Sequence, residues 1–348
     1  MNMNTCPFFG KCGGCGFDVA AANYRDIKLS VLKHIPTTQP PVWINPGTRR
    51  RADFSVNGGK FGFFAGHSND IVPVCECPIL TPALNKTLPA VAALPWVGSA
   101  GVLMTECANG IDINITSRVP YYSPDFARAA AALPVAVIRA TWNGKDIFRR
   151  MQPFIEFANA RVPFPAGAFL QPSVAGENAL RELIGDSIAP TQESLSDKSP
   201  SDSIPPPTKL GAGKVLDLFC GLGAFTLPFG ATGFDNFAPG IDALNDAART
   251  PHLRATVRDL FKRPLSAREL TKYNAVIMDP PRAGAESQCR EIATTQNIRK
   301  VAYVSCSPET FMRDAKVLES GGYQLTTLTP VDQFAGSTHW ELVGIFER

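Results

Sequence analysis

From residue 214 to the C-terminus, short apolar segments alternate with segments of helical character, and this alternation constrains the fold more than any other feature. The apolar segments are predicted strands; they are KVLDLF at 214–219, a run ending at Ile241-Asp242, Tyr273–Met278, Lys300–Ser305, Tyr323–Leu328 and His339–Phe346. Glu309–Ser320 is a predicted helix that stops at Gly321-Gly322. Strands alternating with helices predict a parallel, doubly wound sheet of the Rossmann-like kind.

The first 165 or so residues have a different pattern. Asn-Gly pairs at 57–58, 109–110 and 143–144 each lie between alternating apolar residues, which is a strong signal for a β-hairpin. A short helix is expected at Leu88–Trp96. We therefore predict an α/β protein with two domains, a β-rich antiparallel domain at 1–165 and a second domain at 166–348. Residues 186–213 are rich in Ser, Pro and Asp, and we expect a flexible insertion there.

Composition sets limits on the class of protein. The chain has 348 residues and a net charge of +3, which permits a nucleic-acid partner without requiring one. No apolar run is long enough to span a membrane, and the N-terminus lacks the apolar core of a signal peptide. We expect a cytoplasmic monomer with reduced thiols, in which the nine cysteines serve metal binding or catalysis rather than disulfides.

A turn that contains two glycines follows the predicted strand at 214–219 and leads into a helix. Gly221 and Gly223 would let the backbone approach a ligand closely, and Thr226 stands where a dinucleotide site would have a third glycine. An acid before the turn, Asp217, suits the α-ammonium group of an amino-acid-bearing cofactor. A second acid, Asp242, is expected to end the next strand, where it can bind ribose hydroxyls. This pattern is typical of class I S-adenosylmethionine methyltransferases, the alternative being a merely structural turn.

A single thiol, Cys306, follows the predicted strand Lys300–Ser305, and Asp279-Pro280-Pro281-Arg282 follows another. A thiol on a rigid strand end can act as a nucleophile, although a buried structural cysteine is the commoner case. Arg282 disfavours methylation of an amino group, for which an aromatic residue would be usual at this position. A nucleophilic cysteine instead indicates methylation at carbon 5 of a pyrimidine. Because the thiolate is the reactive form, we expect the site to lower the pKa of Cys306.

The N-terminus carries cysteines with the spacing C-x5-C-x2-C, at Cys6, Cys12 and Cys15. Cys75 and Cys77 lie about 60 residues further on. Three close thiolates and a distant fourth can hold either one tetrahedral zinc ion or an iron–sulfur cube, and the spacing alone does not choose between them.

Together these motifs make the chain resemble the RNA uracil-5-methyltransferase family over nearly its whole length. Ser305-Cys306-Ser307-Pro308 is similar to the family's Ser-Cys-Asn-Pro segment, which implies that Cys306 is the nucleophile. Thr338-His339-Trp340-Glu341 is similar to its C-terminal His-x-Glu, which implies that Glu341 is the base. The resemblance also implies a set of contacts to S-adenosylmethionine by Gln171 (in Phe169-Leu170-Gln171), Phe219, Asp242, Asp259 and Asp279. Ser307, Ala224 and Ser173 depart from the family, which usually has Asn at these positions.

The same resemblance implies what the cysteines hold. Ribosomal-RNA members of the family carry a 4Fe-4S cluster on this spacing, with a fourth ligand just before a proline. This implies Cys6, Cys12, Cys15 and Cys77 as ligands and leaves Cys75 out. The cluster favours 23S ribosomal RNA over transfer RNA as substrate. We also expect this chain to lack the N-terminal TRAM barrel, an RNA-binding unit, that many relatives have.

Other functions are open at this stage. A non-catalytic RNA-binding protein with a structural zinc would show no methyl transfer, and an iron–sulfur redox enzyme would need a flavin or nicotinamide motif that is incomplete here. Arginine runs at Arg49–Arg51 and Arg149–Arg150 are candidate phosphate contacts, the alternative being solvated loops.

Overall fold

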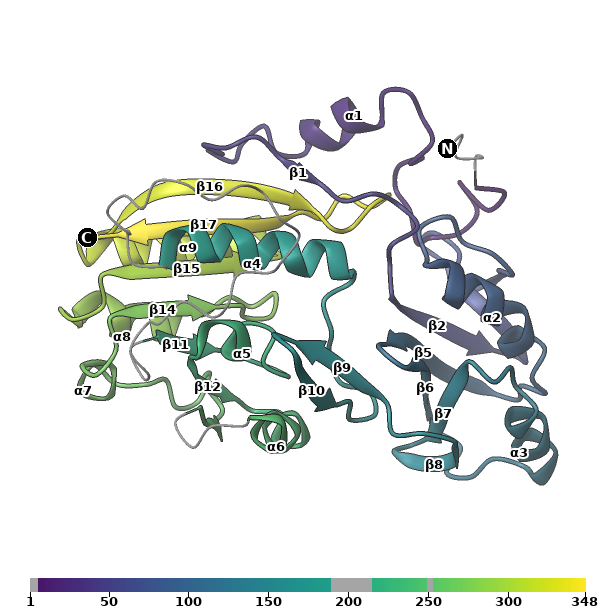
Figure 1. The fold of residues 1–348 in the computed structure, drawn as a ribbon. Helices are drawn as coiled ribbons and strands as arrows, with labels where there is room; N and C mark the ends of the chain where they lie inside the picture. Colours follow the sequence, from purple (N-terminus) through teal and green to yellow (C-terminus); the bar gives the residue numbers. More distant parts are fainter. Residues whose placement is uncertain (1–5, 189–214, 249–252) are drawn as a thin grey trace, which may run out of the picture.

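The computed structural model describes residues 6–188, 215–248 and 253–348, and it contains two large sheets (Figure 1). The first sheet has seven strands in the order β4-β3-β2-β5-β6-β7-β8. These strands are β2 (Arg51–Asn57), β3 (Lys60–Phe64), β4 (Ile71–Pro73), β5 (Ser99–Cys107), β6 (Gly110–Ser117), β7 (Val137–Trp142) and β8 (Lys145–Arg149). The three Asn-Gly hairpins are confirmed, because they join β2 to β3, β5 to β6 and β7 to β8.

The first sheet is not antiparallel throughout. Strands β6 and β7 pair in parallel, and the connection between them carries helix α3 (Pro124–Ala131). A parallel pair needs a crossover of this kind, whereas an antiparallel pair needs only a turn. The helix predicted at Leu88–Trp96 is α2 and spans Pro82–Ala92 instead. Its start follows the rules for a helix N-terminus, since Thr81 caps it and Pro82 occupies the first turn.

The second sheet has eight strands in the order β1-β16-β17-β15-β14-β11-β12-β13. Its strands are β1 (Val42–Trp43), β11 (Val215–Leu218), β12 (Thr232–Asp235), β13 (Ala255–Val257), β14 (Ala275–Met278), β15 (Lys300–Ser305), β16 (Gln324–Asp332) and β17 (Glu341–Glu347). The five from β11 to β15 run in parallel, and β17 is antiparallel to both β15 and β16. The short strand β1 comes from the N-terminal half of the chain and pairs with β16.

Helices cover both faces of the second sheet, as the continuous apolar strands require. Helix α4 (Val174–Ile188) packs on the face formed by Val215, Ile277 and Val304. The opposite face is covered by α8 (Glu286–Thr294) and α9 (Pro308–Ser320). The remaining elements are α1 (Tyr24–Ser30), α5 (Thr226–Phe229), α6 (Ala238–Ala247), α7 (Ala267–Leu270) and the two-stranded ribbon of β9 (Phe154–Phe157) and β10 (Ala160–Pro163). This architecture confirms the predicted fold class.

One sequence prediction falls mostly on residues that the structure does not describe. Of the predicted insertion at 186–213, residues 186–188 form the end of α4, and the rest lies outside the described residues. None of the helices in the described residues is long and apolar enough to cross a membrane.

Candidate active site

The carboxyl ends of the parallel strands meet at one edge of the second sheet, and the predicted site residues gather there. Phe219 follows β11, Asp279 follows β14 and Cys306 follows β15. Open parallel sheets bind ligands at this edge. Glu341 arrives from the other direction, because β17 is antiparallel to β15 and Leu342 pairs with Ser305. This register places the predicted base beside the predicted nucleophile.

A chain of buried hydrogen bonds links the cofactor residues to the base. Gln171 donates its Nε2 to Asp279 Oδ2 at 2.8 Å. The side-chain amide of Gln333 then donates both to Gln171 Oε1 at 3.0 Å and to Glu341 Oε2 at 2.7 Å. Gln333 belongs to none of the sequence motifs described above. Its role depends on the pairing of β16 with β17, which sets Gln333 next to the start of β17, and a single sequence gives no signal of that register.

The two carboxyl groups in this series of hydrogen bonds, Asp279 and Glu341, both have raised pKa values. Burial raises the pKa of Asp279 to about 7, and the charge of Asp235 adds to the effect while the hydrogen bond from Gln171 opposes it. Burial also raises the pKa of Glu341 well above its ordinary value, and the negative charge of Asp279 raises it further. The hydrogen bond from Gln333 acts in the opposite direction, because it stabilises the ionised carboxylate.

The thiol of Cys306 departs from expectation. The pKa of this thiol is raised to about 11, whereas the sequence predicts a lowered pKa. Burial is the main cause, and the charges of Glu341 and Asp279 add to it, while Arg282 has the opposite effect. The thiol therefore favours its protonated form, because burial and two nearby carboxyl groups disfavour a thiolate.

The cofactor turn has the left-handed backbone that glycine favours. Gly221 and Gly223 have φ angles of 52° and 93°. A Cβ atom on Gly223 would lie 2.5 Å from a methyl group of Leu244, so helix α6 packs directly against the turn. Asp217 lies buried below it and accepts a hydrogen bond from Thr226 at 2.6 Å, which gives the threonine a structural role at the position of a third glycine.

The acid that follows the second strand is Asp235 and not Asp242. The predicted strand ending at Asp242 is wrong, because Ala238–Ala247 forms α6 and Asp242 is exposed on that helix. The apolar spacing of 240, 241 and 244 is helical, and Pro239 lies in the first turn. The actual strand, Thr232–Asp235, is short and half polar. Asp235 accepts hydrogen bonds from the amides of Gly221 at 3.0 Å and Phe237 at 2.8 Å.

Asp259 lies in the turn after β13, apart from the buried hydrogen-bond chain. Its Oδ1 accepts from the amides of Phe261 and Lys262, each at 3.1 Å, and these bonds lower its pKa. A cavity of about 140 Å³ lies nearby, lined by Phe219, Phe261 and the loop at 283–288. The cavity therefore lies at the carboxyl edge, between the cofactor turn and the segment that follows Asp279.

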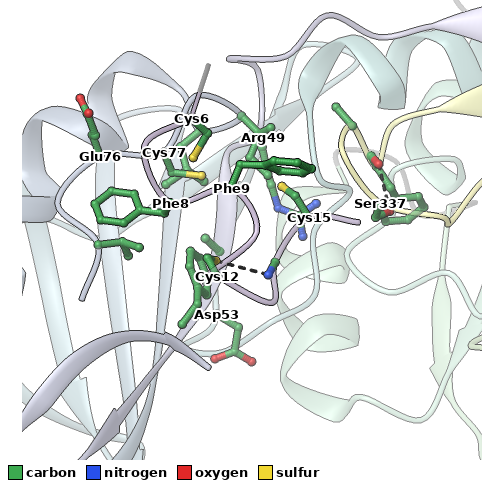
Figure 2. Close-up of a pocket in the computed structure, with 18 of the residues that line it drawn as sticks. Cys6, Phe8, Phe9, Cys12, Cys15, Arg49, Asp53, Glu76, Cys77 and Ser337 are labelled. Carbon is green, nitrogen blue, oxygen red and sulfur yellow. Dashed lines mark hydrogen bonds between the residues drawn. The ribbon is translucent and has the colours of Figure 1, made fainter. Parts of the chain in front are cut away.

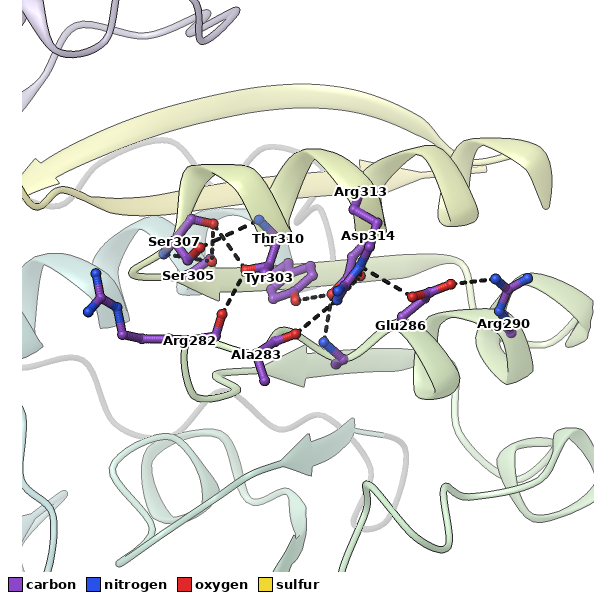
Figure 3. A network of polar contacts seen from close by, with 11 residues as sticks. Arg282, Ala283, Glu286, Arg290, Tyr303, Ser305, Ser307, Thr310, Arg313 and Asp314 are labelled. Atoms are coloured by element: carbon purple, nitrogen blue, oxygen red, sulfur yellow. Dashed lines mark hydrogen bonds and ion pairs between the residues drawn. The ribbon is translucent and has the colours of Figure 1, made fainter.

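A network on α9 fixes the loop that follows Asp279-Pro280-Pro281-Arg282 (Figure 3). The buried carboxylate of Asp314 accepts hydrogen bonds from the Ala285 amide and the Tyr303 hydroxyl, both at 2.6 Å. Thr310 donates to the carbonyl of Arg282 at 3.1 Å. Ser307, where the family has Asn, caps the N-terminus of α9. Strand β15, the Arg282 loop and α9 therefore hold Cys306 and Arg282 in one rigid unit.

Four cysteines from two distant segments surround a second cavity of about 330 Å³ (Figure 2). They are the predicted ligands Cys6, Cys12, Cys15 and Cys77, whereas Cys75 is exposed and does not line the cavity. Burial and the neighbouring thiols raise the pKa of Cys15 to about 12, and burial raises that of Cys77 to about 11. A bound cation would lower these pKa values, because it stabilises thiolates.

As they stand, no three His, Cys, Asp or Glu side chains in the described ranges are arranged to hold one metal ion. The donor set still fits a 4Fe-4S cluster in kind and number. Each thiolate of such a cube binds a different iron, so the four sulfurs stand further apart than they do around a single zinc ion.

One residue in each arginine run has a structural role: Arg50 is buried, so the solvated-loop interpretation is wrong for it, whereas Arg150 is exposed. Arg50 is buried, forms an ion pair with Glu177 at 2.6 Å and donates to the carbonyl of Gln171 at 3.0 Å. It thus holds the segment that carries Gln171. Arg150 donates to carbonyls of 131, 133, 134 and 137 and thereby caps the end of α3.

Comparisons with known proteins fit this geometry. A family model described as tRNA (Uracil-5-)-methyltransferase matches residues 252–348. An uncharacterized RNA methyltransferase of Caulobacter vibrioides is 36% identical over 99% of this chain and 85% of its own length. The chain belongs to the RNA uracil-5-methyltransferase family. This membership makes it an enzyme and sets aside the non-catalytic and redox alternatives.

Two more distant relatives carry specific names. The 23S rRNA (uracil(1939)-C(5))-methyltransferase of Salmonella typhi is 27% identical over 99% of this chain and 81% of its own length. Among solved structures, the tRNA (uracil-54, C5)-methyltransferase of Pyrococcus abyssi in complex with S-adenosyl-L-homocysteine has a TM-score of 0.69. It covers 93% of this chain and 82% of its own at 18% identity, which supports the same fold. These family ties identify the chain as an RNA methyltransferase that uses S-adenosylmethionine.

Proposed function

We propose that this enzyme methylates carbon 5 of a uridine in 23S ribosomal RNA through a covalent bond between Cys306 and the base. The observation that carries the proposal is the meeting of Cys306 and Glu341 at the carboxyl edge, where the Ser305–Leu342 register brings β17 beside β15. Carbon 5 of uracil is a poor nucleophile, and addition of a thiolate to carbon 6 makes it reactive.

The residues can then act in a defined order. The thiol of Cys306 gives its proton to solvent and the resulting thiolate adds to carbon 6, which leaves an enolate with its charge at carbon 5 and oxygen 4. S-adenosylmethionine supplies the methyl group that carbon 5 takes up. Glu341 removes the remaining hydrogen from carbon 5 as a proton. The electron pair restores the double bond between carbons 5 and 6, and the sulfur of Cys306 leaves as a thiolate.

The raised pKa values suit a site that becomes active only when it is filled. Burial and like charges raise the pKa of both Cys306 and Glu341, so both groups disfavour their charged forms. A methyl donor with a positive sulfonium group favours the ionised forms of nearby acids. Binding of the donor at this edge would therefore promote both the thiolate and the ionised base, and would do so only when the methyl group is available.

The cofactor contacts are proposed at the same edge. Phe219, Gly221 and Gly223 form the turn, and Gln171 and Asp279 form the far side of the buried hydrogen-bond chain. Asp235 is the acid suited to ribose hydroxyls, in place of Asp242. Asp259 is suited to the adenine end beside the cavity at Phe219 and Phe261.

We infer that Cys6, Cys12, Cys15 and Cys77 hold a 4Fe-4S cluster in the cavity that they line. The presence of this cysteine set supports ribosomal RNA as the target. So does the similarity to the Salmonella 23S rRNA enzyme, which extends over 99% of the chain. The division into a β-rich domain at 1–165 and a methyltransferase domain at 166–348 is part of the same proposal, although β1 pairs with the second sheet.

The test is to incubate the protein with labelled S-adenosylmethionine and total RNA from a strain that lacks it. The proposal predicts label in one uridine of 23S ribosomal RNA, mapped as 5-methyluridine. Label in transfer RNA would move the target to the second candidate without changing the chemistry. Label on an exocyclic amino group would refute the reaction type.

A further inference from the structure

The turn between β16 and β17, residues 333–340, connects the cysteine cavity with the proposed base. At its ends are Gln333 and, immediately after it, Glu341, which are hydrogen bonded to each other at 2.7 Å. Its middle part, including Phe334, Ala335 and Ser337, forms a wall of the cysteine cavity. Figure 2 shows Ser337 on the side of the cavity where Cys15 lies. One short segment therefore contacts both the cysteine cavity and the proposed base.

Helix α1 holds this turn through one buried lysine. The side chain of Lys28 has no exposed surface, and its ammonium group donates to the carbonyls of Phe334 at 3.0 Å, Ser337 at 2.7 Å and His339 at 2.8 Å. The same nitrogen lies 2.8 Å from Asp332 Oδ1, so a carboxylate balances its charge. An ammonium group has three hydrogens to donate, and here they face three carbonyls of the turn and the carboxylate of Asp332 at the end of β16.

Residues 16 and 17, next to Cys15, add a second set of contacts at the centre of the turn. The amides of Gly16 and Phe17 both donate to the carbonyl of Gly336, at 2.7 and 2.9 Å. The amide of Gly336 in turn donates to the hydroxyl of Tyr24 at 3.1 Å, and that hydroxyl donates to Asp332 at 2.8 Å. Gly16 and Phe17 directly follow Cys15, and Tyr24 lies in α1. Both parts of the chain therefore hold the turn in place.

We propose that Lys28 is a positioning residue for the base of the methylation reaction, and that residues 16–28 set the geometry of Glu341 from outside the methyltransferase sheet. The proposal rests on the proposed function, in which Glu341 removes the proton from carbon 5. Lys28 does not touch substrate or cofactor. It fixes the backbone at 334, 337 and 339, and this backbone determines where Gln333 and Glu341 meet.

This role has a specific consequence for the reaction sequence. Addition of Cys306 and uptake of the methyl group precede the step that needs Glu341. Loosening the turn should therefore slow release of the methylated base while leaving formation of the covalent bond intact. A lysine that only stabilised the fold would affect both steps together, in proportion to the amount of folded protein.

The experiment compares the two steps in a Lys28→Met/Asp332→Asn double variant, which removes the buried ion pair without leaving an unpaired charge. RNA containing 5-fluorouridine has no removable proton at carbon 5, so the amount of adduct formed with it reports addition of Cys306 and uptake of the methyl group, without release. With ordinary uridine RNA, decay of the labelled adduct reports release. Both substrates are total RNA from cells that lack the protein. The control variant is Lys33→Met, which changes an exposed lysine just beyond α1.

The double variant should form the 5-fluorouridine adduct to within about twofold of the unmodified protein and release ordinary adduct about tenfold more slowly, as expected when a charged hydrogen-bond donor is lost. Lys33→Met should change neither step. An unchanged release rate, or an equal loss in both steps per folded molecule, would overturn the positioning role. Failure of the unmodified protein to form any adduct would instead refute the proposed function.

Discussion

Replacing Gln333 with leucine should move the pH dependence of the reaction. The Gln333 amide is the hydrogen-bond donor that holds down the pKa of Glu341 at 2.7 Å, against burial and the charge of Asp279. A hydrogen bond to a charged group contributes about 1.5–3 kcal/mol. Since about 1.4 kcal/mol corresponds to one pKa unit, Gln333→Leu should raise the pKa of Glu341 further, by about one to two units.

The sign of the change follows from the role of the base. Glu341 accepts a proton only when it is ionised, so a higher pKa leaves less active enzyme at pH 7. Release of the methylated base should therefore slow by about 10- to 100-fold at pH 7 and recover as the pH rises. The assay is the release rate of labelled adduct between pH 6 and 9, with formation of the adduct measured alongside.

A matched control exists in the same half of the protein. Gln288 is also a buried glutamine with two hydrogen bonds, to the amide of Leu265 at 2.8 Å and to its carbonyl at 3.1 Å, but it lies on α8. Gln288 also lines the cavity proposed for the adenine end, so Gln288→Leu should lower stability and weaken cofactor binding, but it should not move the pH profile of adduct release. If Gln333→Leu leaves the profile in place, or moves it toward acid pH, the argument for the Gln333–Glu341 contact is wrong.

Three further changes test other parts of the structure. Arg50→Met should lower the free energy of unfolding by about 1.5–3 kcal/mol, because the buried Glu177 carboxylate loses one charged hydrogen-bond donor and keeps its second partner, Arg181. Chemical denaturation should detect this loss. The salt dependence of RNA binding should stay the same, and a weaker dependence would place Arg50 at the RNA interface. Burial raises the pKa of Asp217 to about 8 and of Asp279 to about 7, so the folded protein binds more protons than the unfolded chain and stability should fall from pH 4 to pH 8. Asp279→Asn should flatten that slope in denaturation curves, and an unchanged slope would count against the buried acid. Cys77→Ser should abolish bound iron in anaerobically purified protein while Cys75→Ser retains it, and stoichiometric zinc in place of iron would contradict the cluster.

The sequence predicts the scaffold well where local chemistry decides the structure. Asn-Gly pairs define hairpins because few other residues tolerate the backbone of those turns, and the continuous apolar strands at 275–278 and 300–305 predict a sheet that is buried on both faces. The residues at the ends of these strands, Asp279 and Cys306, could therefore be placed at a common edge from the sequence alone.

The sequence is less informative where long-range pairing decides the outcome. Asp235 was missed because its strand is short and polar, while the apolar run before Asp242 belongs to a helix. Gln333 gains its role only from the pairing of β16 with β17. The environment of Cys306 depends on long-range pairing in the same way, since burial, followed by the charges of two carboxyl groups from distant segments, raises the pKa of the thiol.

The central claim is that Cys306 bonds to the uracil and that Glu341 ends the reaction. The most direct measurement is mass spectrometry of the Glu341→Gln variant after incubation with S-adenosylmethionine and ordinary RNA. Because glutamine cannot take the proton from carbon 5, a stable protein–RNA adduct should accumulate, with a methylated uracil attached to the peptide that contains Cys306. Normal turnover without any adduct, or an adduct on a different cysteine, would contradict this account.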